Sequence, residues 1–292
     1  MKDVYFKVWD IAKKEIYHFI KLYNISKIHY TFEDYFNHIT TQYKIKTLPH
    51  HFSDEAILGL TLIDNLGISF SYESESSPNR QNFTKCHELG HLVLQHSGTV
   101  FAENAQNQDW QEKEANYFSS FVLMPDIILL SKIVYQQQSF QDLSKELKVS
   151  PQALEIRLED FLHYQGHFSI EQAKEVIFQY KTRKSDILIQ LIQAFKEKII
   201  KEYEAVQIED IDYFKKLTTE TDFITNQEIT SLIDPDFQQT LKKQFPHFRI
   251  SAYYDKGLAI WYTWNTQALS EIDSRRKAKF KHYDIQNKGT SW

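Results

Sequence analysis

Cysteine is almost absent from this chain: there is one among 292 residues, so no disulfide can form within it. No apolar run reaches the ~18 residues of a membrane-spanning helix, and the N-terminus lacks the apolar core of a signal peptide. Positive charge is not in excess either, since 34 basic side chains stand against 39 acidic ones, which argues against a general nucleic-acid binder. We therefore expect a soluble, cytoplasmic protein.

One pentapeptide carries recognisable chemistry: His87-Glu88-Leu89-Gly90-His91 has the pattern H-E-x-x-H. On an α-helix, positions i and i+4 share a face, so His87 and His91 can direct ring nitrogens at one metal ion. Glu88 lies beside them, placed to take a proton from a metal-bound water. The pattern predicts a hydrolase.

The flanking sequence predicts that this motif lies on a buried helix from about Asn79 to His96. Ser77-Pro78 is a helix-start signal, and Ser97-Gly98 is a stop signal. Cys86 precedes the first histidine, and we interpret it as a small buried filler because adjacent helical residues point ~100° apart.

A catalytic zinc site usually has three protein ligands, so a third is needed. The candidates are His96, Glu112 and Glu114. His96 does not fit the spacing of the long zinc motif. The two glutamates lie on a second predicted helix, from Asp109 to Pro125, which the proline ends.

The two glutamates differ in their helix faces. Glu112 shares its face with small residues such as Ala115, so a neighbouring helix can approach there, and Gly90 is suitably small for the other side of that contact. We predict Glu112 as the third ligand, with Asn116 one turn later orienting a ligand from behind. Glu114 shares a face with bulky aromatics and is predicted to be a solvated surface charge.

Two linked motifs resemble the ImmA/IrrE metallopeptidases, whose pattern runs FT-x-x-HELGH and then E-x-x-A-N-x-F-A-x-x-LLMP. The resemblance covers about Ile25 to Phe161, and Cys86, Ser119 and Phe121-Val122 are small departures from the pattern. The matching residues are Asn82-Phe83-Thr84-Lys85-Cys86-HELGH, Glu112, Ala115-Asn116, Phe118 and Val122-Leu123-Met124-Pro125.

The resemblance implies an intracellular endopeptidase that cleaves an Xre-type helix-turn-helix repressor and so derepresses mobile-element or stress genes. By analogy, His87, His91 and Glu112 would bind Zn²⁺ and Glu88 would be the general base. The alternative is a non-catalytic regulator that sequesters the repressor and uses the metal structurally. The residue that stabilises the oxyanion stays open among Tyr117, His96, Tyr72 and Arg80.

We expect an α+β fold: a helical zincin-like domain with a small sheet beside the motif helix, then a helix-rich C-terminal region with a short hairpin. The predicted division is 1–125 for the metallopeptidase domain, 126–167 for a helix-turn-helix-like extension and 168–292 for a region of unknown role, for which a sensor or a substrate selector is the hypothesis. Oligomeric state is not predicted.

Hydrophobic periodicity predicts helices at Val4–Leu22 and Phe32–Tyr43. The runs Ala56–Ile63 and Ile68–Tyr72 are predicted strands, joined by the turn Asp64-Asn65-Leu66-Gly67 as a hairpin. A free sheet edge there could align an extended substrate.

Ser139 to Phe161 resembles a helix-turn-helix, with Ser139 and Ser150 as caps. Its second helix carries more acidic than basic residues, so we interpret it as scaffold or as a docking surface for the repressor and not as a DNA reader.

The last third has no motif that we recognise. Its hydrophobic pattern predicts long helices over Ile170–Val206, shorter helices over Gln207–Phe245 that break near Asp234-Pro235, and a strand pair over Arg249–Trp264. The basic segment Arg275–Lys281 is expected to be a solvated, mobile terminus.

Overall fold

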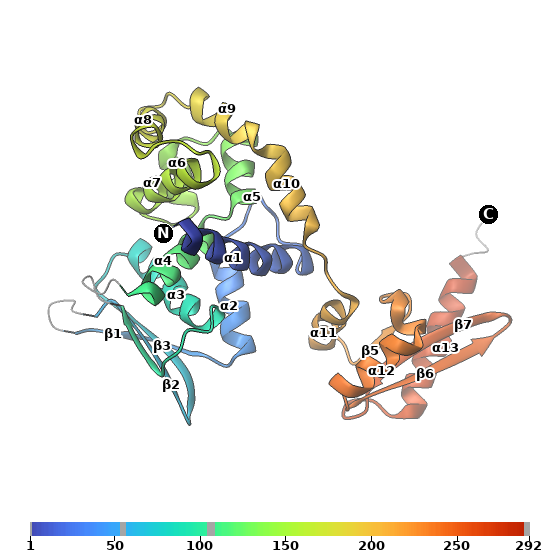
Figure 1. Cartoon of the computed structure of the whole chain (residues 1–292). Helices are drawn as coiled ribbons and strands as arrows, with labels where there is room; N and C mark the ends of the chain where they lie inside the picture. Colours follow the sequence, from blue (N-terminus) through green and yellow to red (C-terminus); the bar gives the residue numbers. More distant parts are fainter. Residues whose placement is uncertain (1, 53–56, 104–108, 289–292) are drawn as a thin grey trace. The chain divides into compact units, whose positions relative to one another are not determined.

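The chain folds into two compact units, Met1–Val206 and Gln207–Trp292 (Figure 1). The computed structural model describes residues 2–52, 57–103 and 109–288. The observed boundary follows Val206, whereas the predicted one lay at residue 168. The difference arises because the helices between 170 and 205 add their apolar faces to the core of the first unit. The α+β class is confirmed.

The first unit holds a run of helices and one sheet. In chain order its elements are α1 (Lys2–Leu22), α2 (Phe32–Gln42), β1 (Lys46–His50), β2 (Gly59–Asp64), β3 (Gly67–Glu73), α3 (Pro78–Val93), β4 (Val100–Glu103), α4 (Trp110–Leu123), α5 (Asp126–Leu129), the π-helix η2 (Leu130–Tyr135), α6 (Phe140–Glu146), α7 (Pro151–Asp160), the π-helix η3 (Phe161–Gln165), α8 (Ile170–Lys181), α9 (Asp186–Ala194) and α10 (Lys196–Ala205).

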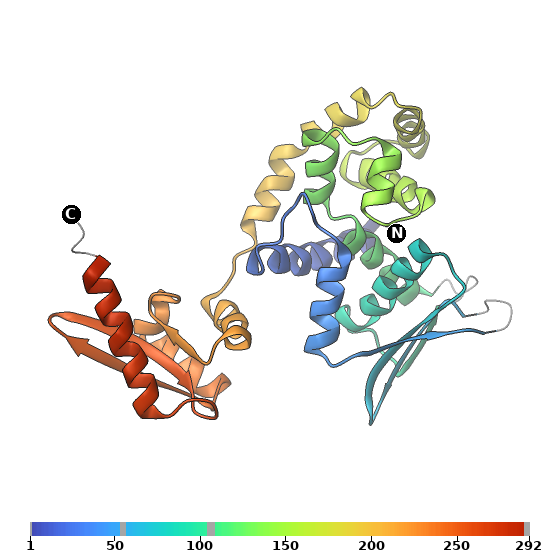
Figure 2. The ribbon, with the colours of Figure 1, turned by 180° about the vertical axis from the view of Figure 1, so that it is seen from behind.

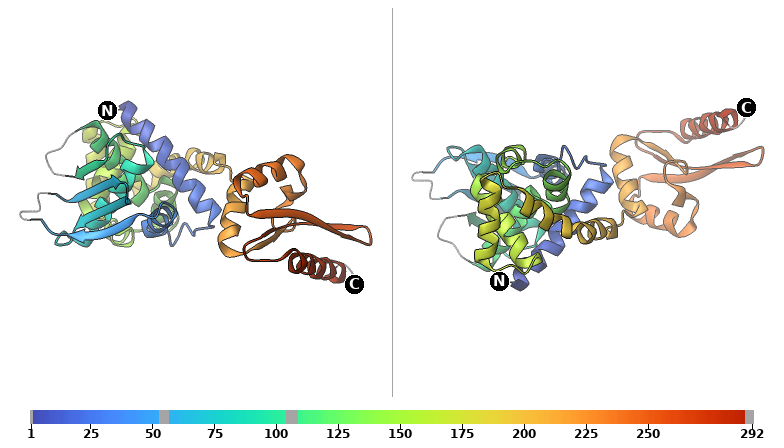
Figure 3. Two further views of the ribbon diagram at one scale, coloured as in Figure 1. Left: turned by 90° about the horizontal axis from the view of Figure 1, so that it is seen from below. Right: turned by 90° about the horizontal axis from the view of Figure 1, so that it is seen from above.

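The sheet has the strand order β1-β3-β2-β4. β2 and β3 form the predicted antiparallel hairpin, with Asp64 opposite Gly67, and the predicted start at Ala56 lies outside the described residues. β1 pairs parallel with β3, and β4 pairs antiparallel with β2 as an edge strand. The helices of this unit lie on one side of the sheet (Figure 3).

α3 and α4 pack closely because each has a small residue at the contact, Gly90 on α3 and Ala115 on α4. A Cβ at Gly90 would lie 3.2 Å from Cα of Ala115 and 3.2 Å from the ring of Phe118. The predicted approach at Gly90 is therefore confirmed. α3 begins as predicted, with Ser77 accepting a hydrogen bond from the backbone N–H of Arg80.

The helix-turn-helix-like unit, α6 and α7, is held to the core by a buried ion pair. The guanidinium of Arg157 contacts the carboxylate of Asp126, and its Nε donates to the carbonyl of Met124 at 3.2 Å. Trp9 Nε1 on α1 donates to the other Asp126 oxygen at 2.7 Å. One aspartate therefore joins α1, α5 and α7.

Although no uninterrupted apolar run reaches ~18 residues, Trp110–Tyr135 is a helical stretch of 26 residues that is long and apolar enough, by length and composition, to cross a membrane. However, 78% of its most apolar window is buried inside the protein. Burial of this kind is typical of the core helix of a soluble protein.

The second unit is a three-stranded sheet of order β5-β7-β6, with helices on both faces. Aromatic residues on β7 such as Tyr262 and Trp264 belong to its core. Its elements are α11 (Asp210–Glu220), β5 (Phe223–Thr225), the 3-10 helix η4 (Thr230–Ile233), α12 (Pro235–Gln244), β6 (Phe248–Asp255), β7 (Leu258–Asn265) and α13 (Glu271–Lys288).

The expectation of a mobile basic terminus at Arg275–Lys281 is wrong. These residues form part of α13, which crosses one face of the sheet (Figure 2). Ser274, Ala278 and His282, four residues apart, are fully buried, and His282 Nε2 bonds to the Asp255 carbonyl at 2.8 Å. The charges occupy the remaining faces, and the short buried stripe between them gave too weak a pattern to predict the helix.

We expect Asp126→Ala to lower the free energy of unfolding by about 3–5 kcal/mol, because it leaves the buried Arg157 charge unpaired. The matched control is Asp10→Ala, which breaks the exposed Lys14–Asp10 pair and is expected to cost less than ~1 kcal/mol. Urea unfolding measures both variants. Equal, small losses would contradict the structural role of Asp126.

Candidate metal centre

α3 carries His87 and His91 one turn apart, and both rings are buried. The helix ends at Val93, earlier than predicted, because Gln95 adopts a left-handed conformation with φ 55°. The chain then turns back, and the backbone N–H of His96 donates to the His91 carbonyl at 3.0 Å. This early end brings His96 beside His91.

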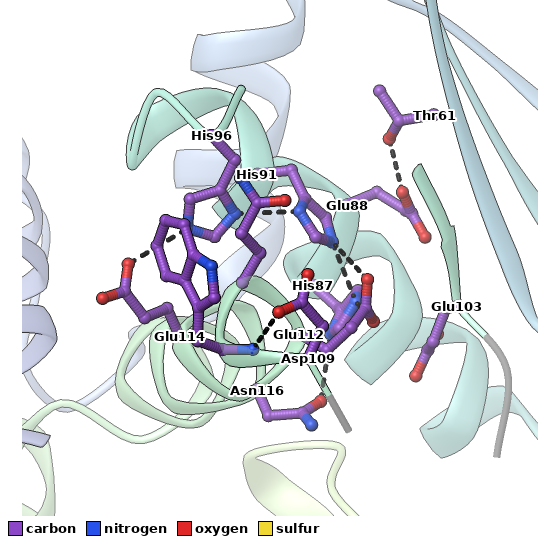
Figure 4. Close-up of polar contacts among 12 residues, drawn as sticks. Thr61, His87, Glu88, His91, His96, Glu103, Asp109, Glu112, Glu114 and Asn116 are labelled. Carbon is purple, nitrogen blue, oxygen red and sulfur yellow. Dashed lines mark hydrogen bonds and ion pairs between the residues drawn. The ribbon is translucent and has the colours of Figure 1, made fainter. Parts of the chain in front are cut away.

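Three side chains converge on one point (Figure 4). His87 Nε2 lies 3.1 Å from His91 Nε2 and 3.1 Å from Glu112 Oε2, and His91 Nε2 lies 3.5 Å from Glu112 Oε1. Tetrahedral coordination with bonds of ~2.0–2.1 Å places ligand atoms about 3.3 Å apart. The spacing and chemistry of these donors therefore fit a single divalent metal ion.

The charge around this point also fits a cation. The carboxylates of Glu88, Glu103 and Glu112 are all buried near His87, and Arg80 compensates only Glu103. Burial lowers the pKa of His87, but the hydrogen bond to Glu112 and the nearby carboxylates outweigh it, so the pKa is raised. Buried excess negative charge is costly unless it is paired or bound to a metal.

His87, Glu88 and Glu103 form a second group whose ligand atoms also lie within 4.8 Å of one another. Its carboxylates are already engaged. Glu103 accepts from Arg80 and, at 2.8 Å, from Thr84, while Glu88 accepts from Thr61. The group with Glu112 is therefore the better metal site.

Each histidine is oriented from behind by a hydrogen bond. His87 Nδ1 lies 3.0 Å from Asn116 Oδ1, an acceptor, so this ring donates from Nδ1, and a metal ion that displaced the proton from Nε2 would find the lone pair there. His91 Nδ1 lies 2.9 Å from His96 Nδ1. Burial and the two neighbouring imidazoles lower the pKa of His91 to about 2, so the ring is neutral, as a metal ligand must be.

A hydrogen-bonded chain continues from His91 away from the metal point. His96 Nε2 lies 3.1 Å from Glu114 Oε2, and Lys7 Nζ on α1 lies 2.7 Å from Glu114 Oε1. His96 can therefore donate to Glu114 from Nε2 and accept from His91 at Nδ1.

The prediction that Glu114 is a solvated surface charge is wrong, since only 3% of this residue is exposed. The face argument considered α4 alone, whereas α1 packs on that face and brings Lys7 to the carboxylate.

Glu88 is held at one oxygen and free at the other. Thr61 Oγ1 on β2 donates to Oε2, while buried Oε1 has no hydrogen-bond partner among the described residues. Burial raises the pKa of Glu88 to about 8, although His87 and the bond from Thr61 oppose the shift. Gly59 makes room for this carboxylate, because a Cβ there would collide with Oε1 and lie 2.6 Å from Thr84 Cγ2.

Sequence reasoning did not find Thr61, Glu103 or Gly59. They come from β2 and β4, and only the sheet brings them to α3. Cys86 is fully buried in the core, as predicted, and burial raises the pKa of its thiol.

The four side chains predicted as candidates for stabilising an oxyanion lie in different places. Arg80 and Tyr117 line the same cavity as His87 and Glu112. His96 lies behind His91, and the ring of Tyr72 contacts the ammonium of Lys85 at 4.3 Å from its centroid.

That cavity has a volume of about 690 Å³ and lies between α3, α4 and α7. Its lining residues are Ser77, Asn79, Arg80, Phe83, His87, Glu103, Glu112, Lys113, Asn116, Tyr117, Ser120, Leu123, Val149, Ser150, Gln152, Ala153, Ile156 and Asp160.

A helix with H-E-x-x-H and a glutamate from the next helix, beside a small sheet, define a metallopeptidase-like domain. Residues 41–159 match the family model described as the IrrE N-terminal-like domain. This match supports the predicted ImmA/IrrE-type family for residues 41–159, and that family supports a peptidase. No curated protein matches the chain.

We expect His96→Leu to weaken zinc binding ~10–100-fold, because it removes the acceptor that orients His91. Glu114→Gln should also weaken zinc binding, but less than His96→Leu does. Competition with a chromophoric chelator measures both, and Glu175→Gln, at an exposed position of α8, is the control. Affinities equal to that of the control would show that this chain of contacts does not support the metal.

Proposed function

We propose that this protein is a cytoplasmic, zinc-dependent endopeptidase that cleaves an Xre-type helix-turn-helix repressor and so derepresses mobile-element or stress genes. The observation that carries the enzymatic part is a carboxylate with one free, buried oxygen, Glu88, next to the donor set His87, His91 and Glu112. The choice of substrate rests on the family resemblance.

Zinc bound by these three residues would polarise a scissile carbonyl and lower the pKa of a water molecule to roughly 7. The charge of a bound zinc ion would lower the raised pKa of Glu88, so that Glu88 could accept a proton at Oε1, while Thr61 fixes Oε2, and later return the proton to the leaving amine. Asn116 and His96 hold the two imidazoles in the tautomer that leaves Nε2 free. Arg80 and Tyr117 are placed to contact a substrate in the cavity.

A structural metal site has no use for a base and normally fills its fourth position with a protein ligand. Among the described residues, the group at this point provides three such side chains. This favours catalysis over a regulator that only sequesters the repressor.

We expect Glu88→Gln to reduce cleavage ~10²–10⁴-fold without loss of zinc, because the amide cannot accept the proton. The purified, metal-analysed protein is incubated with the Xre-like repressor encoded nearest to its gene, and the repressor is followed by mass spectrometry beside the Glu175→Gln control. Cleavage at one bond by wild type and control supports the proposal. Binding without cleavage by all three proteins would favour the sequestering regulator.

We expect Gly59→Ala to lower kcat/KM at least ~10-fold while zinc content stays unchanged, because the new methyl group displaces the Glu88 carboxylate. Cleavage rate and bound zinc are measured on the same sample, and the melting temperature reports any loss of folded protein. Unchanged kcat/KM would show that Glu88 does not need the position described.

A further inference from the structure

The cavity beside the metal centre has three helical walls. α3 lines it with Asn79, Phe83 and His87, and α4 lines it with residues from Glu112 to Leu123. The third wall is α7, whose lining residues recur at helical spacing: Gln152, Ala153, Ile156 and Asp160. The second helix of the helix-turn-helix-like unit thus turns one face toward the space onto which His87 and Glu112 open.

The third wall is firmly positioned. Asn79 Nδ2 donates to the Val149 carbonyl at 3.1 Å, and Asn82 Nδ2 donates to the Lys148 carbonyl at 3.1 Å. At the other end of α7, Arg157 is fixed by Asp126 and the Met124 carbonyl. Both ends of the helix are thus bound to the metallopeptidase-like domain, and the cavity is preformed.

The lining of the cavity is mixed in character. His87, Glu103 and Glu112 make one part polar, while Phe83, Leu123, Val149, Ala153 and Ile156 supply apolar surface. A volume of about 690 Å³ is in the range of sites that enclose a ligand. The apolar part of this lining can take the methylene stem of a long substrate side chain.

Asp160 places a carboxylate on this lining at the end of α7. The residue is half-buried, and its carboxylate has no hydrogen-bond partner among the residues that the structure describes. Burial raises its pKa to about 6, against the lowering effects of Arg157 and His163 and with Glu159 adding to the rise. Arg157 acts on Asp160 through its charge but directs its hydrogen bonds to Asp126 and the Met124 carbonyl, so the Asp160 oxygens keep their capacity to accept from a further cation.

The other cations on the lining do not reverse this preference. Arg80 is paired with Glu103, and Lys113 is exposed, so its charge is hydrated and screened.

We propose that the cleft between α3, α4 and α7 receives a substrate side chain close to the scissile bond, and that Asp160 selects lysine or arginine there. The apolar lining takes the methylene stem, and the carboxylate binds the cationic end. This inference rests on the proposed peptidase function and names the specificity of the same site.

The test uses the zinc-loaded full chain and three sets of fluorogenic peptides. Within a set, one residue is placed at each peptide position in turn, and that residue is arginine in the first set, norleucine in the second and glutamate in the third. At one position, wild type should cleave the arginine peptide at least ~10-fold better in kcat/KM than the norleucine peptide. Asp160→Asn should reduce this ratio to within ~3-fold, and Asp160→Lys should shift the preference to glutamate. Glu159→Gln removes the neighbouring charge outside the lining and should keep the wild-type ratio.

Zinc content and melting temperature verify that each variant is folded. A ratio that survives both Asp160 variants, or that Glu159→Gln reduces equally, overturns the proposal.

Binding separates failure of this inference from failure of the peptidase function. If wild type cleaves none of the peptides, the same peptides carrying a fluorophore are titrated with the zinc-loaded proteins and followed by anisotropy. If wild type binds the arginine peptide more tightly than the others and Asp160→Asn removes this preference, the result supports the Asp160 subsite without the peptidase function. Equal binding of all three sets overturns the subsite as well.

Discussion

Helices α3 and α4 approach each other until a Cβ at Gly90 would lie 3.2 Å from Cα of Ala115. At this distance a glutamate one turn before Ala115 reaches the two histidines on either side of Gly90, and three ligand atoms meet within 4.8 Å. Any larger residue at the contact would separate the helices and thereby the ligands. The metal centre is therefore a consequence of backbone packing, and the ligand side chains need only ordinary helical geometry.

The same close packing buries several carboxylates, and residues from other elements of the unit compensate their charge. Carboxylates near His87 are paired by Arg80, Thr84 and Thr61, which come from α3 and β2. Behind His91, the charge of Glu114 is met by Lys7, a residue from the first helix of the chain. The sheet and α1 thus belong to the site as much as α3 and α4 do, since unpaired polar groups at this depth would cost several kcal/mol.

How far the sequence predicts this arrangement depends on the range of the interactions. Helical spacing and caps predicted α1, α2, α3, α4, α6 and α7 to within a few residues, and the small face around Glu112 predicted its side of the contact. β4 escaped prediction because four residues carry little periodicity, although Phe101 stacks on His91 and Glu103 lies beside His87. Glu114 was misplaced because its burial depends on α1, more than 100 residues earlier. Contacts between distant segments leave no periodic trace in either segment.

The helix-turn-helix-like unit illustrates how surroundings decide the use of a motif. A DNA-reading helix needs a basic, solvent-facing surface that a groove can enter. Here one face of α7 lines the cavity next to the metal centre, and Arg157, its basic residue, is fully buried in an ion pair with Asp126. The remaining charges on α7 are the carboxylates of Glu155, Glu159 and Asp160, which would repel phosphates. These observations favour recognition of a polypeptide in the cleft over recognition of DNA, because α7 turns one face toward the cavity that a substrate would enter and packs its buried face on the rest of the unit.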